Sequence, residues 1–428
     1  MNSRKEYISD QWFRSYWTDS THFEEHRALT SDLKTDVVVI GGGVTGLSVA
    51  YSLIKEGKGC IVIESGTIGG GETQHSSAHL TQALDSRYYT LQQIYGIKNT
   101  SLIAQSHTAA INRIERIIKR ENINCDFQRL NGYLVSHPSD TAKSLQREFE
   151  ATRRVGLATE LLTTAEDMRL RDKIALKFPR QAQFHPLKYL QGLCRAFVQN
   201  GGHVFTNTRA VSIDESGVNT SHHRIHADHV VVATNQPFND RFTMLTKQIQ
   251  YRSYIIAATV HKGLISPCLW WDTGRQSDTG GIAPYNYARI QPMDEEYDLI
   301  ICGGQDHVVR DEDGDGKEQA SPQYEHLESW LFDHFPLARD VAYRWSGLVL
   351  EPEDMIGFIG RNVRDTNIYV ITGDAGNGMT YAGIAGVLIP DLILGRKNPW
   401  EKIYSPVRLS SHVPDRSLRK KTQYALAQ

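Results

Sequence analysis

An apolar strand that runs through three spaced glycines straight into a helix is the feature that most constrains the fold of this chain. Residues 37–40 read Val-Val-Val-Ile, and such a β-branched run is typical of a parallel strand covered on both faces. Gly41, Gly43 and Gly46 follow, and residues 47–56 then form a helix-favouring stretch. The pattern predicts a strand–turn–helix unit of an α/β fold built on a parallel sheet.

A second strand and an acidic residue complete the pattern of a dinucleotide-binding unit. Residues 60–63 are again apolar, and they end at Glu64, 18 residues after Gly46. In such a unit Gly41 permits the tight turn, Gly43 lets the backbone approach the pyrophosphate, and Gly46 lets helix and strand pack closely. The carboxylate of Glu64 accepts hydrogen bonds from the ribose. The spacing therefore predicts a site for NAD or FAD without choosing between them.

Composition and charge exclude several classes of protein. The 428 residues are 40% hydrophobic and 22% charged, which excludes a wholly disordered, collagenous or coiled-coil chain and leaves length for two or more cores. Lys plus Arg number 47 against 49 Asp plus Glu, so no surplus of positive charge favours nucleic acid as a partner. Glycines interrupt the apolar stretch 36–54 and charges flank it, so we expect no membrane span there.

Cysteine spacing and the ends of the chain bear on metals and on location. The five cysteines include no Cys-x-x-Cys pair, which is unlike a zinc site, an iron–sulfur site or a disulfide scaffold. Residues 311–316 begin like a calcium loop, but Pro322 stands where such a loop needs its bidentate Glu, so we expect a solvated hairpin tip. Residues 1–34 lack the basic-then-apolar order of a secretory signal. We therefore expect a cytoplasmic protein without a bound metal.

Three further segments carry small polar residues beside apolar strands. Residues 69–81 form a glycine-led run that suits backbone lying against a flat ring and a phosphate. Residues 229–235 predict a buried strand that ends in a tight polar turn. Residues 368–372 predict another strand, which leads through the glycine loop 373–380 into a helical pattern at 383–394. This last unit would aim a helix N-terminus at a ligand.

Together these motifs resemble the FAD-dependent amine and amino-acid oxidases of the D-amino-acid oxidase superfamily, which includes glycine, sarcosine and γ-glutamylputrescine oxidases. The resemblance covers nearly the whole chain. It is strongest to γ-glutamylputrescine oxidase-like flavoproteins and to a related group that often carries a C-terminal Rieske domain. No cysteine follows Cys302, so we expect no Rieske cluster. The matching segments are residues 35–37, 41–46, 78–81, 343–347, 373–380 and 398–400.

The resemblance implies an α/β fold in which a Rossmann-like FAD-binding domain is interleaved with an antiparallel-sheet substrate domain. In the substrate part, residues 101–120 have helical periodicity and residues 251–345 alternate like antiparallel strands. The expected boundaries are 1–97, 185–250 and 345–408 for the FAD-binding domain, 98–184 and 251–344 for the substrate domain, and 409–428 for a basic, solvated tail.

The resemblance also implies which residues contact FAD. In the family the first strand–helix unit holds the ADP part, the run after the acidic residue passes the ribityl chain and the ring, and the C-terminal glycine loop contacts the ring's pyrimidine end. The expected FAD contacts are Gly41, Gly43, Thr45, Gly46, Glu64, Ser65, Gly71, Thr73, His75, Ser76, Ser77, Leu80, Val211, Ala233, Thr234, Gly373, Asp374, Gly376, Asn377, Gly378, Met379 and Thr380.

His75 raises the question of a covalent link to the flavin. Residues 71–75 match the Gly-x-Thr-x-His pattern of relatives similar to dimethylglycine dehydrogenase, in which the histidine is bonded to the flavin. The flanking sequence is more similar to the noncovalent group. We therefore expect noncovalent FAD, with a link at His75 as the alternative.

Aromatic residues are expected to wall the substrate pocket. Trp271 and Tyr287 are the leading candidates, with Trp270, Tyr285 and Trp345 near them in the pattern. An aromatic pocket suits an amine or an alkyl chain, and ordinary sheet packing is the alternative for each ring.

Catalytic candidates are fewer because oxidation of a C–N bond needs mainly an uncharged amine and a hydride acceptor. We expect His79, Arg344 and Trp345 near the reacting groups, and a buried histidine bonded to backbone is the alternative for His79. Glycine and D-amino-acid oxidases typically hold the substrate carboxylate with the arginine of a Gly-x-Arg segment, but residues 347–349 read Gly-Leu-Val. Arg344 and Arg289 are the nearby substitutes, and the departure favours amines or modified amino acids.

The resemblance implies an enzyme that oxidises the C–N bond of an amine or amino acid to an imine by hydride transfer to flavin. The flavin would be reoxidised by oxygen or by another acceptor. One alternative is a dehydrogenase that feeds an electron carrier. Others are a flavoprotein acting on a macromolecule such as tRNA, which the balanced charge disfavours, and a flavin-binding protein without turnover.

Overall fold

The computed structural model describes residues 14–140, 142–162, 174–236, 248–274, 285–309 and 321–408. The calcium-loop-like segment at 311–316 and the basic tail at 409–428 lie outside these residues. The described chain forms two large sheets, each built from stretches that are far apart in the sequence.

The first sheet is mainly parallel and contains both apolar runs of the predicted dinucleotide-binding unit. Its strands are β1 (Leu33–Ile40), β2 (Cys60–Ile63), β7 (His203–Phe205), β8 (Ala210–Asp214), β9 (Gly217–Thr220), β10 (Arg224–Val232), β16 (Phe358–Arg361) and β17 (Ile368–Thr372). Their order is β16–β17–β10–β1–β2–β7, and the β8–β9 pair continues from β10. Ile40 pairs in parallel with Ile63 and with Val232, so these three strands end at one edge of the sheet.

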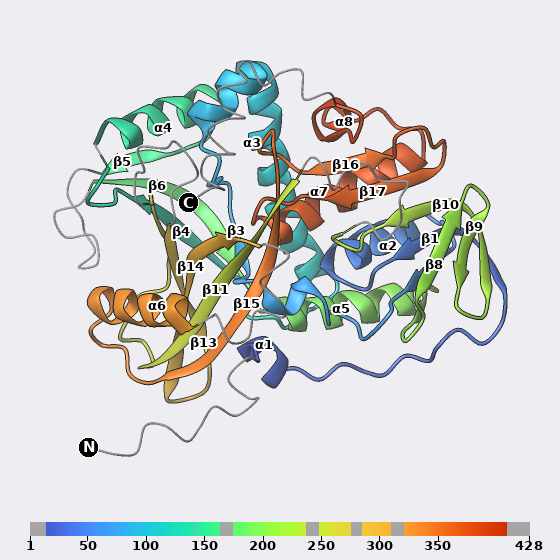
Figure 1. Ribbon diagram of the computed structural model, residues 1–428, viewed down its shortest axis with the longest axis horizontal. Coiled ribbons are helices and arrows are strands. Elements are labelled where there is room, and N and C mark those ends of the chain that lie inside the picture. Colours follow the sequence, from blue (N-terminus) through green and yellow to red (C-terminus); the bar gives the residue numbers. More distant parts are fainter. Residues whose placement is uncertain are drawn as a thin grey trace.

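Three helices pack against this sheet, and the first of them also packs on the other two. They are α2 (Val44–Lys55), α5 (Pro186–Gln199) and α7 (Gly378–Ile393). α2 begins directly after Gly43 and packs on both α5 and α7, as Figure 1 shows. Alternation along β1 gives Val37 and Val39 to the core under these helices and Val38 to a second cluster on the other face. The strands and helices predicted around the two glycine loops are confirmed.

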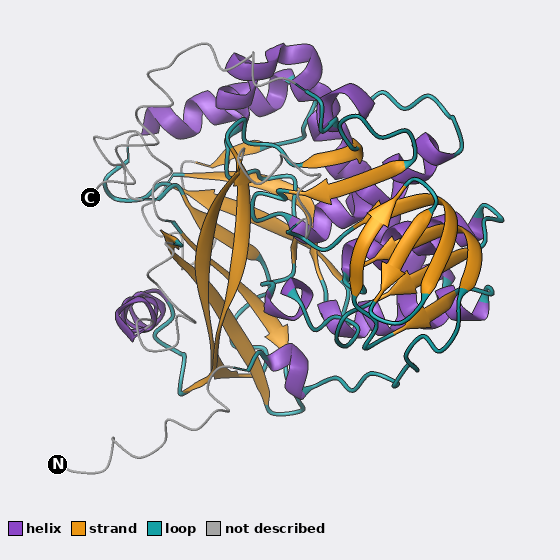
Figure 2. Ribbon diagram, turned by 45° about the vertical axis from the view of Figure 1, so that its right-hand side comes forward, coloured by secondary structure: helices purple, strands orange, loops and turns teal. Residues whose placement is uncertain are grey.

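The second sheet is almost entirely antiparallel. Its strands are β3 (His79–Leu80), β4 (Gln128–Val135), β5 (Glu160–Leu162), β6 (Ala175–Gln183), β11 (Gln248–His261), β12 (Leu269–Asp272), β13 (Asn286–Pro292), β14 (Tyr297–Val308) and β15 (Val341–Pro352). Their order is β15–β11–β14–β13–β12–β4–β6–β3, with β5 beside β6, and β12 and β4 form the parallel pair within it. Figure 2 shows the long, twisted strands of this sheet beside the first sheet and its helices.

The two faces of the second sheet have different partners. Along β11, Tyr254 and Ile256 join the core cluster under α6 (Ser321–His334), which packs on β11 and β14. Tyr251 and Ser253 alternate with them and therefore point to the opposite face, where they line a cavity. Period-two alternation thus makes one face of this sheet structural and the other the floor of a cavity.

The remaining helices connect or cover the sheets. They are α1 (Tyr16–Asp19), the 3-10 helix η2 (Glu72–His75), α3 (Tyr88–Arg120), α4 (Ala142–Arg154) and α8 (Glu401–Tyr404). α3 includes the predicted helical stretch 101–120 and begins earlier, with a kink at Gly96, where φ is 73°. The five cysteines are buried and free. Among the described helices, none is long and apolar enough to cross a membrane.

We expect Gly46→Ala to destabilise the protein because α2 lies directly on the strand-end turn. A Cβ at Gly46 would stand 2.0 Å from the Gly41 carbonyl oxygen, so helix and turn must separate. The free energy of unfolding measured in urea should fall by about 1–3 kcal/mol, the usual cost of overpacking. Gly59→Ala is the control, because its Cβ would meet its nearest atoms at 3.5 Å. Equal stability of the two variants would contradict the packing argument.

Candidate active site

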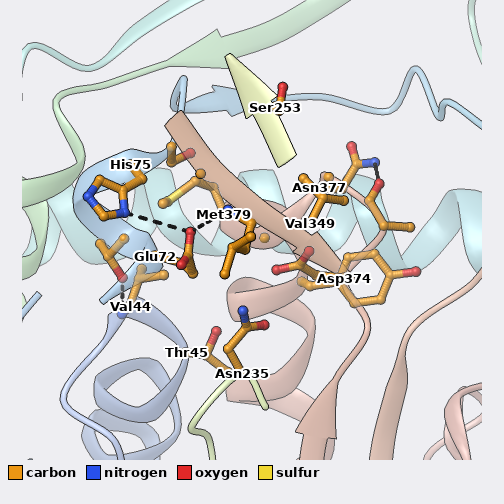
Figure 3. A pocket seen from close by; sticks show the side chains of 18 of the residues that line it. Val44, Thr45, Glu72, His75, Asn235, Ser253, Val349, Asp374, Asn377 and Met379 are labelled. Carbon is orange, nitrogen blue, oxygen red and sulfur yellow. Dashed lines mark hydrogen bonds and ion pairs between the residues drawn. The ribbon is translucent and has the colours of Figure 1, made fainter. Parts of the chain in front are cut away.

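A cavity of about 410 Å³ is lined by residues of both sheets. This volume is within the range of small-molecule sites. Figure 3 shows Thr45 and Asn235, from the first sheet's side, at one end of the view and Ser253 of β11 at the other, and all three line the cavity. The cavity therefore lies where the ends of the parallel strands meet the floor formed by the antiparallel sheet.

The end near α2 has the form of a phosphate cradle. Gly41 has a φ of +114°, and a Cβ there would lie 2.5 Å from the Ala233 carbonyl oxygen, so the turn requires glycine. The first turn of α2 contains no acidic residue, which leaves its positive end free for an anion. The Val44 N–H donates to Thr73 Oγ1 at 3.1 Å, which ties this turn to η2. These features fit a pyrophosphate.

Glu64 is held rigidly at the end of β2. Its Oε2 accepts the Gly42 N–H at 2.8 Å, and its Oε1 accepts the Gly66 N–H at 2.8 Å and the Ser65 hydroxyl at 3.0 Å. A carboxylate has about four lone-pair positions, so Glu64 keeps capacity to accept hydrogen bonds from ribose hydroxyls. Its place in the cavity lining fits the adenosine end of a dinucleotide.

The second glycine loop lies across the cavity at the start of α7. Gly376 has a φ of +76°, and Asp374 accepts its N–H through the side chain. Burial raises the pKa of Asp374 to about 6, the nearby Glu72 adds to the shift, and the Gly376 hydrogen bond opposes it. The first turn of α7 contains no acidic residue. Two helix N-termini therefore face one cavity, which fits an extended ligand with polar groups at both ends.

Two buried tryptophans hold the segment between Gly71 and His79. The Trp17 indole N–H donates to the Ser76 carbonyl at 2.7 Å, and the Trp345 indole N–H donates to the His75 carbonyl at 3.0 Å. Trp345 is 1% exposed and does not line the described cavity. Its indole positions the cavity wall, which differs from the direct catalytic role expected from the sequence.

The two arginines expected near the substrate make other bonds. Arg289 is 1% exposed, and its Nη1 donates to the carbonyls of Ser77, Ala78 and Phe184 at 3.2, 3.0 and 3.1 Å. Its second nitrogen donates to Gln291. Arg344 pairs with Glu328, with Nε at 2.9 Å from Oε1. Among the described residues that line the cavity, neither arginine is found. The guanidinium of Arg289 therefore donates mainly to backbone carbonyls, and that of Arg344 to a carboxylate, so neither is placed to bind a substrate.

Aromatic rings line the floor of the cavity where glycines make room for them. Trp271 and Tyr287 lie over Gly132 and Gly303, whose added Cβ atoms would stand 2.6 Å and 2.2 Å from the respective side chains. Tyr285 lines the same floor. Trp270 alternates with Trp271 on β12 and packs on the other face, 5.1 Å from the Trp330 ring.

His79 presents a neutral imidazole to the cavity. Burial and the nearby Arg289 charge lower the pKa of His79 to about 3, and an interaction with the Ala288 backbone opposes the shift. Its ring lies 5.5 Å from the Trp271 ring and 5.4 Å from the Tyr287 ring. Nδ1 is 3.0 Å from the Ser77 hydroxyl, while Nε2 is buried and has no hydrogen-bond partner in the described chain. When Ser77 accepts from Nδ1–H, Nε2 carries a lone pair that can accept from a substrate N–H.

Carboxyl groups are the main charged groups of the cavity. Six carboxyl side chains line it, and no Lys or Arg does so within the described residues. Burial, with the charges of neighbouring acids, raises the pKa of Asp306 to about 7 and that of Glu351 to about 8. The six are Glu64, Glu72, Asp85, Asp306, Glu351 and Asp374.

Sequence reasoning did not single out Glu72, Asp85, Asp306 or Glu351. Asp306 and Glu351 lie in alternating strands, where a charged residue is normally assigned to the solvent face. Only the pairing of β14, β11 and β15 reveals that this face is enclosed. Tyr251 and Ser253 were missed for the same reason.

Most of the residues predicted to contact cofactor or substrate meet in this one cavity. Those in its lining are Gly41, Gly43, Thr45, Glu64, Ser65, Gly71, Thr73, His75, Ser76, Ser77, His79, Ala233, Thr234, Trp271, Tyr287, Asp374, Gly376, Asn377, Gly378 and Met379. Five predicted cofactor residues are not in the described lining, namely Gly46, Leu80, Val211, Gly373 and Thr380. Val211 lies on β8 and is 57% exposed, and Gly46 packs beneath the Gly41 turn.

Comparison with known proteins gives one consistent result. The model of the family "DAO: FAD dependent oxidoreductase" matches residues 36–392. A putative Rieske 2Fe-2S iron-sulfur protein, YhfW, of Bacillus subtilis strain 168 is 30% identical over 92% of this chain and 75% of its own length. The gamma-glutamylputrescine oxidoreductase of Escherichia coli K12 is 26% identical, over 89% of each chain. The crystal structure of glycine oxidase from Geobacillus kaustophilus aligns with a TM-score of 0.69 and 19% identity, covering 88% of this chain and 99% of that one.

We expect Asp306 and Glu351 to make a contribution to the stability of the protein that is lost as the pH rises from about 4 to about 8. Below about pH 6.5 the buried His79 and His185, whose pKa values are lowered to about 3, act in the opposite direction. Asp306 and Glu351 have folded-state pKa values of about 7 and about 8, above the ordinary values of about 4. At these two groups the folded state therefore keeps protons that the unfolded state has released, and their contribution to the free energy of unfolding falls as pH rises through this window. Urea unfolding at several pH values measures the slope.

The double variant Asp306→Asn, Glu351→Gln should lose less stability than the parent between about pH 6.5 and about pH 8, because it lacks both titrating groups. Glu353→Gln removes an exposed carboxyl next to the same strand and is the matched control. A double variant with the slope of the parent would show that these two carboxyls do not carry the effect.

Proposed function

Because the chain belongs to the family of FAD dependent oxidoreductases, we propose that it oxidises the carbon–nitrogen bond of an amine to an imine. The family match confirms the resemblance inferred from the glycine motifs, and the glycine oxidase alignment confirms the expected α/β fold. The observation that carries the proposal is a cavity with aromatic walls, a neutral imidazole and carboxyl groups, in which the described lining contains no Lys or Arg.

The residues at the two helix N-termini fit FAD. Gly41, Gly43 and the first turn of α2 would receive the pyrophosphate, and Glu64 would receive the ribose hydroxyls. The Asp374–Gly378 loop would face the polar part of the flavin ring. The bound FAD supplies the acceptor for a hydride removed from the carbon next to the substrate nitrogen.

The charge of the cavity favours an amine over an α-amino acid. The carboxylate of an α-amino acid needs a cationic partner, preferably a bidentate arginine. Arg289 already donates to three backbone carbonyls, and Arg344 is paired with Glu328. A substrate carboxylate would instead meet Asp306 and Glu351, whereas an ammonium group would be attracted by them.

His79 is placed to handle the substrate nitrogen. An amine must be uncharged for its carbon to lose a hydride, and the N–H proton must leave as the imine forms. The buried Nε2 of His79 has no other partner in the described chain, and a neutral imidazole can accept such a hydrogen bond. Trp271 and Tyr287 would hold the alkyl part beside it. Water then hydrolyses the imine to a carbonyl compound, with release of ammonia from a primary amine or of the smaller amine from a secondary one.

We expect amines to bleach the flavin absorbance of the purified protein under anaerobic conditions. Each amine is compared with the α-amino acid that has the same side chain. The amine should reduce the flavin at least about tenfold faster, because only the amino acid brings a carboxylate close to Asp306 and Glu351. Admission of air then tells whether oxygen restores the colour, which separates an oxidase from a dehydrogenase that needs another acceptor.

Dithionite provides the control that the flavin can be reduced. Amino acids that bleach the flavin as fast as their amines would overturn the preference for amines. A flavin that dithionite reduces and no compound of either kind bleaches would overturn the proposed reaction.

We also propose that FAD is bound without a covalent link. His75 stands at the end of η2, and its Nδ1 lies 3.7 Å from Glu72 Oε2, an ion pair when the imidazole is protonated. Figure 3 shows the imidazole directed at Glu72.

Acid precipitation should therefore release the flavin into the supernatant, and His75→Ala should still copurify with flavin. Flavin that remains in the wild-type pellet but is released from His75→Ala would establish the covalent alternative.

A further inference from the structure

We propose that the cavity accepts substrates with two cationic nitrogens and holds the second one with Asp85, Asp306 and Glu351. This inference rests on the proposed oxidation of amines and identifies the substrate class as linear diamines or longer polyamines. The three carboxyl groups would bind the ammonium group that does not react. Substrates would then be selected by the distance between their nitrogens.

The strand register separates these carboxyl groups from the aromatic wall. Trp271 pairs with Tyr287, and Tyr287 pairs with Gly303 on β14. Asp306 lies three residues beyond Gly303, and a bulge between them, where Gln305 has a φ of 56°, makes these three residues advance by about two positions of β11, or about 7 Å at about 3.3 Å per residue. Glu351 lies further in the same direction, in the row of β15 that pairs with the start of β11. The floor therefore carries aromatic rings at one end and carboxyl groups at the other.

The carboxyl groups repel one another and have little compensation. The charges of Asp85 and Asp306 both act on Glu351 and favour its protonated form. Arg87 and a hydrogen bond from Tyr285 act in the opposite direction on Asp85, and a hydrogen bond from Ser253 does so on Asp306. No Lys or Arg reaches the described lining of the cavity to neutralise the group. An ammonium ion between these side chains would offset their repulsion and donate hydrogen bonds to them.

Two buried atoms without partners point to a ligand at each end of the floor. Asp306 Oδ1 exposes less than 1 Å² and has no hydrogen-bond partner in the described chain. His79 Nε2, on another strand and beside the aromatic rings, has the same property. Buried polar atoms are rarely left unpaired in native proteins. One N–H donor at Oδ1 and another at Nε2 would satisfy both, as a molecule with two nitrogens provides.

The side chains between the two ends suit the stem and the charge of such a molecule. Tyr285 and Tyr287 line the floor between His79 and Asp306, and their rings lie 6.0 Å apart. Aromatic faces attract cations and also pack on methylene groups. A dication can therefore lie along this floor without an uncompensated contact.

The experiment compares a linear diamine with the monoamine of the same length. Anaerobic, oxidised holoprotein is titrated with each, and binding is followed by flavin absorbance and by proton release into a weakly buffered solution. The diamine should bind about tenfold more tightly than the monoamine, as expected for one added charge pair. It should also release protons near neutral pH, because a bound ammonium favours the ionised forms of Asp306 and Glu351, whose pKa values are about 7 and about 8.

The double variant Asp306→Asn, Glu351→Gln should lose the preference for the diamine and the proton release. Glu353→Gln, an exposed carboxyl outside the described lining, should retain both. If the double variant does not fold, the ratio of affinities and the proton release of the wild-type protein decide by themselves.

Equal affinities of wild-type protein for both amines would overturn this inference. If monoamines nevertheless bleach the flavin, the proposed oxidation stands and only the second site fails. If the diamine binds preferentially and neither amine bleaches the flavin, the second site stands and the proposed oxidation fails.

Discussion

The buried guanidinium of Arg289 holds the segment on which the rest of the site depends. It donates to the successive carbonyls of Ser77 and Ala78. It also donates to the carbonyl of Phe184, the residue that follows β6. The Trp17 ring lies 5.4 Å from the guanidinium and anchors Ser76 through its own N–H. The guanidinium of Arg289, which lies on β13, therefore fixes the segment that precedes β3. Burial keeps His79 neutral, and the nearby charge of Arg289 adds to this effect.

This arrangement explains how one cavity serves two kinds of chemistry. The parallel sheet lines the cavity mainly with backbone. Its glycine turns and the helix N-termini present N–H groups that can bind phosphates, and this does not depend on the substrate. The antiparallel sheet contributes side chains, and these alternate between the core under α6 and the cavity floor. Cofactor binding is thus determined by the chain's local conformation. Under the proposed function, recognition of the substrate would be determined by strand pairing across β12 to β15.

The same division explains what the sequence predicts. The unit from β1 to Glu64 and the loop before α7 are local patterns, so glycine spacing and apolar runs predict both their structure and their place in the cavity. Asp306 and Glu351 are brought together by pairing between distant strands, and no local pattern marks them as buried. Arg289 and Arg344 were expected at the substrate by their charge. Their partners, backbone carbonyls and Glu328, become visible only in the folded chain.

The close fit of Tyr287 on Gly303 and of Trp271 on Gly132 also limits how this protein can evolve. A larger residue in place of either glycine would clash with the ring that packs on it. A smaller residue in place of either aromatic residue would leave a cavity above the glycine. Reshaping the pocket in a productive way therefore takes paired exchanges on neighbouring strands. Descendants that differ by single substitutions should inherit the same aromatic floor. New specificities should arise first at Asp306 and Glu351, which are not among the nearest neighbours of any glycine in the described chain.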